Sequence, residues 1–227
     1  MINIKLKRKY KQFLNEYSDN YNKDALQYIK DNFWECTTSF DIPDILMQVY
    51  SGLNLYDNDI DLYFNYLNSI KSIFKLDCNI LEIGGGMLPI LSNKIAIEQL
   101  NIGKGTITMY DPMLAATKSK YSNLKLYKHE FTSSTNIDDY DLVISIRPCD
   151  VTEDLIKRVC EEKKNFYIQM CGCTHFTIDQ IRKYGLSAES YQKFIIDLAN
   201  NLLGEEVNIT KIDNKFGIDY PILYKKF

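Results

Sequence analysis

Two carboxylates and a run of three glycines are the residues of this chain best suited to binding a ligand. Glu82 stands two residues before Gly84, Gly85 and Gly86 in the stretch ILEIGGGMLP, and Asp111 follows the apolar run TITMY. Glycines let the backbone turn sharply, and they let a ligand approach main-chain atoms that a Cβ would cover. A carboxylate at the end of the next strand can accept hydrogen bonds from two adjacent ribose hydroxyls. The pattern therefore predicts a nucleoside site, although an ordinary strand-to-helix turn also uses glycine.

The charge of Glu82 narrows the kind of nucleoside. A dinucleotide-binding fingerprint needs a further glycine where Pro89 stands, and it places a pyrophosphate at the N-terminus of the following helix. A carboxylate beside that position would repel a diphosphate but attract an amine or a sulfonium. The sequence thus favours a cationic ligand over a dinucleotide.

The elements that must position these residues alternate in type from Cys78 onward. Five runs have the length and the β-branched or aromatic content of strands: NILEIGG, GTITMYD, LKLYKHE, YDLVISIRP and NFYIQMCG. Helical patterns over residues 89–103, 112–123 and 150–164 lie between them, and Asp150 and Thr152 compete as the cap of the third. This alternation predicts βαβ units in a doubly wound α/β fold.

The C-terminal part follows a different pattern. Helical stretches over residues 177–204, with Ser187 as a cap and Gly204 as a stop, precede two strand-like runs, EVNITKID and PILYKKF. No helical pattern separates these two runs, and only antiparallel strands can be joined so briefly. We therefore expect a mostly parallel seven-stranded sheet that ends in an antiparallel hairpin.

The stretch ILEIGGGMLP followed by TITMYDPM resembles motif I and the acidic position after it in the class I S-adenosylmethionine-dependent methyltransferases. The resemblance implies a Rossmann-like catalytic domain over residues 76–227 that binds S-adenosyl-L-methionine. It places Glu82 near the methionine amino end, Asp111 on the ribose hydroxyls and Glu130 near the adenine amine. The cofactor-binding residues that it implies are Glu82, Gly84, Gly85, Gly86, Asp111, Pro112, Glu130 and Phe131.

Two positions depart from the family pattern. The usual third glycine of motif I is Leu88 here, and Glu130 is followed by Phe131 rather than by a small residue, which leaves the local loop shape open. The stretch GGGMLPILS also resembles a glycine–leucine–proline loop of nicotianamine synthase, which has a helical N-terminal part on the same cofactor fold. That second resemblance is one short motif, and it implies transfer of the aminobutyrate arm of the cofactor instead of its methyl group.

Candidate catalytic residues follow the fourth and fifth predicted strands. Arg147, in SIRPCD, can hold a carboxylate or a phosphate in bidentate fashion, or it can pair with Asp150. His175, in MCGCTHF, can act as general base for a hydroxyl or an amine, or it can be a solvated loop side chain. His129 is expected to flank the adenine pocket. The fourth strand lacks the Asn/Asp-Pro-Pro-aromatic signature of many base and amide N-methyltransferases, which counts against those substrates.

Three cysteines and a histidine follow the same two predicted strands. Cys149, Cys171, Cys173 and His175 would lie close together if the fourth and fifth strands are neighbours. Thiolates with an imidazole suit zinc, but Cys-x-Cys is not the usual spacing and cysteine is common at buried strand ends. We assign no metal to them.

Length and composition restrict the class of protein. The 227 residues allow one full domain with an appendage, and residues 1–75, which show amphipathic helical patterns, are expected to form a helical cap. A net charge of -3 leaves no global basic surface for nucleic acid. The sequence shows neither a secretory signal nor a membrane-spanning run, and its six cysteines lack a framework spacing, which favours reduced thiols in the cytoplasm.

These observations together predict a cytoplasmic methyltransferase that acts on a small molecule, anionic if Arg147 binds it, without nucleic acid or membrane as partner. Two other interpretations stay open. One is aminobutyrate transfer from the same cofactor, and the other is a non-catalytic nucleotide-binding module that has kept the fold.

Overall fold

The computed structural model describes residues 62–86, 89–114, 118–119, 121–171, 176–212 and 220–227. The chain divides into two compact units, Met1–Tyr63 and Phe64–Phe227, and nearly all of the described residues belong to the second. The predicted helical cap over residues 1–75 lies outside the described residues up to residue 61. Its last part is helix α4 (Leu62–Ile73).

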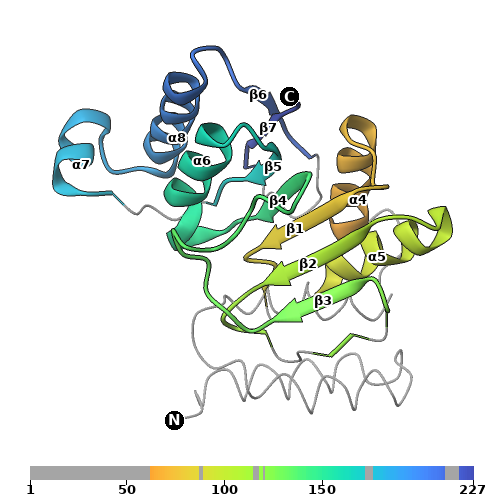
Figure 1. Cartoon of the computed structure of the whole chain (residues 1–227). Helices are drawn as coiled ribbons and strands as arrows, with labels where there is room; N and C mark the ends of the chain where they lie inside the picture. The colour runs from red at the N-terminus through yellow and green to blue at the C-terminus, as the bar shows by residue number, and fades with distance from the viewer. Residues whose placement is uncertain (1–61, 87–88, 115–117, 120, 172–175, 213–219) are drawn as a thin grey trace, which may run out of the picture. The chain divides into compact units, whose positions relative to one another are not determined.

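A seven-stranded sheet organises the second unit (Figure 1). Its strands are β1 (Asn79–Ile83), β2 (Thr106–Tyr110), β3 (Leu124–Tyr127), β4 (Leu142–Ile146), β5 (Asn165–Gln169), β6 (Asn208–Thr210) and β7 (Ile222–Lys225). They lie in the order β3-β2-β1-β4-β5-β7-β6. The pairs among β1 to β5 are parallel, whereas β7 is antiparallel to both β5 and β6. The predicted mostly parallel sheet with an antiparallel end is therefore confirmed.

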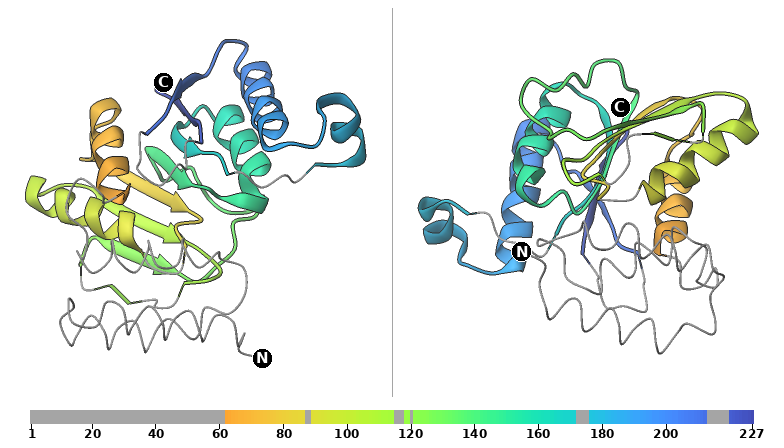
Figure 2. Two further views of the ribbon diagram at one scale, coloured as in Figure 1. Left: turned by 180° about the vertical axis from the view of Figure 1, so that it is seen from behind. Right: turned by 90° about the horizontal axis from the view of Figure 1, so that it is seen from below.

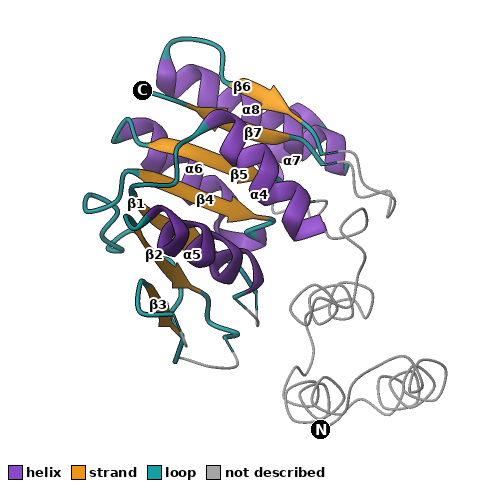
Figure 3. Cartoon of the chain, turned by 90° about the vertical axis from the view of Figure 1, so that its right-hand side faces the viewer, coloured by secondary structure: helices purple, strands orange, loops and turns teal. Residues whose placement is uncertain are grey.

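Helices cover both faces of the sheet (Figures 2 and 3). On one face lie α4 and α5 (Ile90–Ile102), and on the other lie α6 (Thr152–Glu161) and α8 (Ala188–Leu203). The short α7 (Ile178–Tyr184) precedes α8 and projects beyond the sheet. This two-sided cover confirms the doubly wound α/β class, in which central strands are apolar because both of their faces are buried.

Alternation along β1 decides which way Glu82 points. The last four residues of β1 are buried, and successive side chains of a strand point to opposite faces. Leu81 and Ile83 join the large apolar cluster that includes side chains of α6 and α8. Glu82, between them, therefore points to the face that α5 covers.

Helix ends agree with the sequence at α8 and differ from it at α6. Ser187 Oγ accepts a hydrogen bond from Ser190 N at the start of α8, and Gly204 ends that helix with a φ of 70°. Asp150 does not cap α6, which corrects the sequence-based expectation. The 3-10 turn η2 (Cys149–Val151) contains Asp150 and places Val151 at the N-cap of α6.

The predicted helix over residues 112–123 is wrong for the described residues of that segment, which show turns and irregular backbone. The Asp111 carboxylate accepts a hydrogen bond from Met113 N, and Leu114 N donates to Asp111 O at 3.3 Å. Such local bonds compete with the helical pattern of hydrogen bonds. The carboxyl end of β2 is therefore followed by a turn that Asp111 itself holds.

Candidate functional site

The glycine turn after β1 lies between β2 and the segment that follows β4. Gly84 and Gly86 have φ angles of 68° and 87°, which a residue with a Cβ adopts only with strain. Gly84 N donates to Tyr110 O at 3.0 Å. A Cβ on Gly84 would lie 3.2 Å from Pro148 Cα, so the two backbones approach closely here and a side chain would displace Pro148.

Glu82 lies directly beneath this turn. It is 1% exposed, and its Oε2 accepts a hydrogen bond from Ser92 Oγ in the first turn of α5. A Cβ on Gly85 would lie 2.8 Å from Glu82 Oε1 and 2.6 Å from Met109 Cε. The carboxylate thus fills the space that a side chain at Gly85 would need, and it occupies the N-terminal end of α5.

Burial changes the acidity of Glu82. The pKa of its carboxyl is raised from 4.5 to about 7, chiefly by burial and in part by the nearby Asp111 carboxylate, while hydrogen bonds from the Ser92 side chain and backbone act in the opposite direction. The protonated and ionised forms of Glu82 are therefore comparably populated near neutral pH. A positive charge placed close to it would favour the ionised form.

Asp111 ties the glycine turn to the end of β2. It is 5% exposed, its Oδ2 accepts from Gly86 N and its Oδ1 accepts from Met113 N, both at 2.7 Å. Burial raises the pKa of Asp111, and these two amide hydrogen bonds oppose that rise. Each carboxylate oxygen has a further lone pair, so the group can still accept two hydrogen bonds from a vicinal diol. Pro112, the next residue, is exposed.

Glu130 and Phe131, the two residues after β3 predicted to bind the cofactor, differ in exposure. Glu130 is exposed, whereas Phe131 is 5% exposed and packs in the apolar cluster beneath α6 and α8. His129 lies between them and β3, with its Nδ1 at 2.6 Å from Glu130 O and its ring edge-on to Tyr110 at 6.2 Å. Phe131 therefore anchors this segment in the core. The exposed Glu130 side chain could contact only a ligand that lies on the surface of the segment.

The backbone after β4 adopts an unusual conformation. Arg147 and Cys149 have φ angles of 57° and 47°, on either side of Pro148, and Arg147 N donates to Gln169 O at the end of β5 at 3.0 Å. Positive φ at residues other than glycine is strained and is concentrated at functional sites. Because Pro148 also contacts the position of Gly84, this strained turn joins the end of β4 to the glycine turn.

The second catalytic candidate, His175, lies outside the described residues, as does Cys173. Cys149 is half-buried and Cys171 is buried, and neither forms a disulfide. Over the described ranges of the chain, no group of three or more His, Cys, Asp and Glu side chains is placed to hold a metal ion. The roles of Arg147 and His175 stay predictions.

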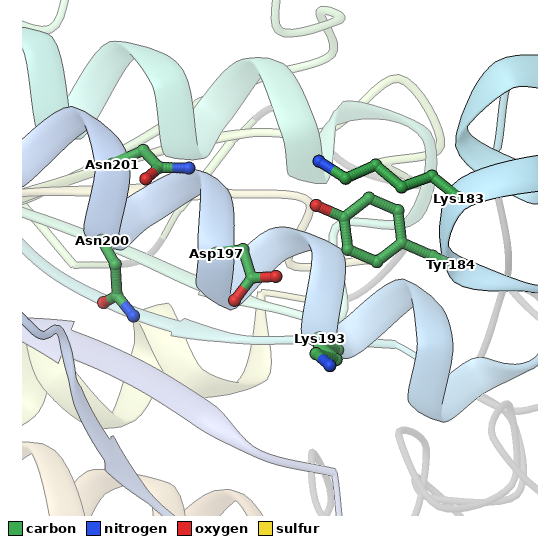
Figure 4. Close-up of a pocket in the computed structure, with 6 residues that line it drawn as sticks. All are labelled: Lys183, Tyr184, Lys193, Asp197, Asn200 and Asn201. Carbon is green, nitrogen blue, oxygen red and sulfur yellow. The ribbon is translucent and has the colours of Figure 1, made fainter.

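A cavity of about 590 Å³ lies elsewhere, between α7 and α8 (Figure 4). Its lining consists of polar and charged side chains from these two helices: Lys183, Tyr184, Lys193, Asp197, Asn200 and Asn201. None of them belongs to the glycine turn or to the ends of β1, β2 and β3. This cavity therefore lies apart from the residues predicted to bind a nucleoside.

Across the described residues, no helix combines the length and the apolar character that crossing a membrane requires.

Sequence reasoning missed the protein partners of both carboxylates. Ser92 was placed in a predicted helix and in the motif GGGMLPILS, but it was not paired with Glu82. It stands in the first turn of α5, on the face toward which alternation along β1 directs Glu82. That alternation is the signal that could have identified the pair. Gly86 N and Met113 N, the donors to Asp111, are backbone groups and leave no trace in residue types.

Comparisons with known proteins add a likeness of fold. No protein-family model matches the chain, and no curated protein has significant sequence similarity to it. Among solved structures, the CurJ carbon methyltransferase is 12% identical with a TM-score of 0.48, over 96% of this chain and 70% of that one. A phosphoethanolamine N-methyltransferase 2 from Haemonchus contortus in complex with S-adenosyl-L-methionine is 16% identical with a TM-score of 0.43, over 71% and 42%. The CMeT domain of the citrinin polyketide synthase is 14% identical with a TM-score of 0.46, over 88% and 64%.

The chain thus spans less than two thirds of the length of the last two structures. Identities this low carry no argument about activity. The fold assignment rests on the observed strand order β3-β2-β1-β4-β5-β7-β6, with its single antiparallel strand between two neighbours, which matches the Rossmann-like fold of the class I methyltransferases.

Proposed function

We propose that the chain binds S-adenosyl-L-methionine at the glycine turn and transfers the methyl group to a small molecule. One observation carries this proposal: a buried carboxylate of the protein, Glu82, occupies the N-terminal end of α5 beneath a turn that has no side chains. In sites for phosphorylated nucleotides, that end of the helix receives the phosphate. A second phosphate-repelling group, Asp111, follows the neighbouring strand.

The charge of the site supports a cationic nucleoside. Among the described residues, the hydrogen-bond donors to Glu82 and Asp111 are neutral: the Ser92 hydroxyl and amide, and the amides of Gly86 and Met113. Burying carboxylates among neutral donors is unfavourable and raises the pKa of both. A ligand with a positive sulfonium and amine would offset this, whereas a diphosphate would add to it.

Each residue of the site then has a defined task. The cofactor, when bound, would supply a methyl group activated on a sulfonium. The Asp111 oxygens would accept the two ribose hydroxyls, and the bare backbone of Gly84 to Gly86 would allow close approach of the chain to the ligand. Glu82 would act through space from beneath the turn, because it is too deeply buried for direct contact.

The acceptor would lie at the carboxyl ends of β4 and β5. Methyl transfer is an in-line displacement, for which the protein mainly aligns the acceptor and excludes water. There we assign to Arg147 the binding of an anionic group of the acceptor, and to His175 the removal of a proton where the acceptor needs it. The strain of the Arg147–Cys149 backbone supports a role for this turn beyond packing.

Calorimetric titration with S-adenosyl-L-methionine and S-adenosylhomocysteine tests the proposal. We expect dissociation constants in the micromolar range, about -7 to -8 kcal/mol. Asp111→Asn should weaken binding by about 1–3 kcal/mol, because a neutral amide is a poorer acceptor for two hydroxyls. Asp179→Asn on α7, where the side chain is 89% exposed, is the matched control and should leave binding unchanged.

The reaction products distinguish the alternatives. S-adenosylhomocysteine reports methyl transfer, whereas methylthioadenosine reports aminobutyrate transfer. Failure of the wild type to bind either cofactor form would refute the proposal. Unchanged affinity of Asp111→Asn would refute the role of that residue while leaving the cofactor in place.

A further inference from the structure

Residues 128–141 connect β3 to β4 without a helix. Phe131 and Ile137 anchor this segment, since both are buried in the cluster beneath α6 and α8. Between the two anchors, Thr135 N donates to Thr132 O and Thr132 N donates to Thr135 Oγ1, both at 2.9 Å. This tight turn leaves the carbonyl groups of Ser133 and Thr135 without a helical partner.

Arg158 of α6 supplies those partners. Its Nη1 donates to Ser133 O and its Nη2 donates to Thr135 O at 3.3 Å, so one guanidinium bridges two carbonyls of the turn. Its Nε donates to Glu162 Oε1 at 2.5 Å, and this bond to the C-cap residue of α6 fixes the orientation of the guanidinium plane. The Arg158 side chain is 21% exposed, so these bonds are partly shielded from water.

Lys164 performs the same task at the other end of the segment. Its Nζ donates to Asp138 O at 2.8 Å and to Tyr140 O at 3.3 Å. Two cationic side chains on and after α6 thus bind backbone carbonyls that a helix would otherwise satisfy internally. The conformation of the 128–141 segment therefore depends on contacts from outside it, and Arg158 holds the half that lies nearer to β3.

That half lies where a nucleoside base would be. β3 neighbours β2 on the side away from β1, so the carboxyl ends of β1, β2 and β3 follow one another along one edge of the sheet. A nucleoside with its 5′ substituent at the glycine turn and its ribose on Asp111 extends its base toward the end of β3. The segment from Glu130 to Thr135 starts close to the end of β3, and the buried Phe131 side chain attaches it to the core.

We infer that Arg158 is a positioning residue for recognition of the base, which acts by fixing the turn at 132–135 from the far side and never touches the ligand. The inference rests on the proposed function. Without the guanidinium, the segment samples other conformations. For a ligand whose base is read by this segment, the apparent dissociation constant then rises by the inverse of the fraction that stays competent, whereas a ligand whose base the segment does not read is unaffected. If the competent fraction falls to about one tenth, affinity falls about tenfold.

The test compares two ligands that differ only in the base: S-adenosylhomocysteine and S-inosylhomocysteine, in which a carbonyl replaces the adenine amine. Calorimetry is run on the wild type, Arg158→Met, Arg158→Lys and Glu162→Gln. Arg158→Met keeps the aliphatic stem and removes every hydrogen bond. Glu162→Gln is the matched control, because it removes the charge of the ion pair but keeps a side-chain oxygen that can accept from Arg158 Nε, so the guanidinium can keep its orientation and its two carbonyl contacts.

We expect the wild type to prefer the adenine ligand. Arg158→Met should bind S-adenosylhomocysteine about tenfold more weakly, and its preference between the two bases should fall toward one, because a loosened segment no longer reads the base. The affinity and the base preference of Arg158→Lys should be intermediate, since lysine keeps the positive charge but cannot donate to both carbonyls with a planar guanidinium. Glu162→Gln should match the wild type within about twofold, because the carbonyl contacts persist.

Three results would overturn the inference. Arg158→Met and Arg158→Lys could both bind like the wild type, they could lose the two ligands in equal proportion, or the wild type could show no preference between the bases. The second result would show a merely structural role, and thermal unfolding of the same variants would register it as a lowered midpoint. Normal binding of S-adenosylhomocysteine by the wild type in any of these cases leaves the proposed function standing, whereas absent binding removes both.

Discussion

Replacement of Glu82 by glutamine tests whether the Glu82 carboxyl group is shielded from water beneath the glycine turn, Gly84 to Gly86. In the folded protein burial raises the pKa of Glu82 above its ordinary 4.5, to about 7. The folded chain therefore holds this proton more tightly than the unfolded chain does. The stability that this group contributes is fully present below pH 4.5 and is lost as the pH rises through 7. Glutamine cannot ionise, so the variant should lack this dependence.

The size of the effect follows from the shift. At 1.36 kcal/mol per pKa unit, a rise from 4.5 to about 7 corresponds to a loss of about 3 kcal/mol once Glu82 is fully ionised. Between pH 5 and pH 8 the stability of the wild type should therefore fall by about 2–3 kcal/mol relative to that of Glu82→Gln. The comparison of the two proteins cancels the contributions of the other titrating groups.

Urea unfolding at pH 5, 6, 7 and 8 on the wild type and Glu82→Gln measures this difference. The exposed Glu206→Gln is the control and should run parallel to the wild type at every pH. A constant difference between Glu82→Gln and the wild type across this range would refute the reasoning. It would mean that Glu82 is ionised in the folded state with an ordinary pKa.

Other substitutions address the rest of the site and its support. Gly85→Ala should destabilise the fold by about 1–3 kcal/mol in urea unfolding and weaken cofactor binding, because its Cβ would lie 2.8 Å from the Glu82 carboxylate; a stability equal to that of the wild type would contradict the packing described. Gln99→Leu should lower the free energy of unfolding by about 2–4 kcal/mol, because Gln99 Nε2 lies within 3.2 Å of the carbonyls of Leu76, Cys78 and Thr106; its cofactor affinity, measured on the folded fraction, should be normal, and a loss of affinity would show that the amino end of the sheet influences the site.

The sheet could be predicted from sequence because the apolar content and the spacing of its strands are visible in the residue types. β4 is buried at all five positions and is apolar at every one except Ser145, and β7 follows β6 too closely for a crossover helix. The segment over 112–123 could not be predicted in this way. Its pattern is compatible with a helix, but the Asp111 side chain binds Met113 N and favours a turn, a competition that residue types alone do not decide.

The sequence predicts that Glu82, the glycines and Asp111 lie close together, which the structure shows, but it does not predict how deeply Glu82 is buried. Glu82, the glycines and Asp111 follow from type and spacing, but the sequence placed Glu82 beside the ligand. The structure places it beneath Gly85, bonded to Ser92. The contacts of Arg158 could not be predicted for a different reason. Its partners are the carbonyls of Ser133 and Thr135, and every residue has a backbone carbonyl. Contacts to backbone are a class of interaction that sequence patterns do not record.

The central claim is that this site takes a nucleoside with a positive charge and rejects one with phosphates. The most direct measurement is a pair of titrations of the wild-type chain at pH 8, one with S-adenosyl-L-methionine and one with ADP, which share adenine and ribose but differ in the charge of the 5′ substituent. At that pH Glu82 is mostly ionised, since its pKa is about 7. We expect S-adenosyl-L-methionine to bind at least about a hundredfold more tightly, a difference of about 2.7 kcal/mol. Binding of ADP with equal or greater affinity would contradict the claim.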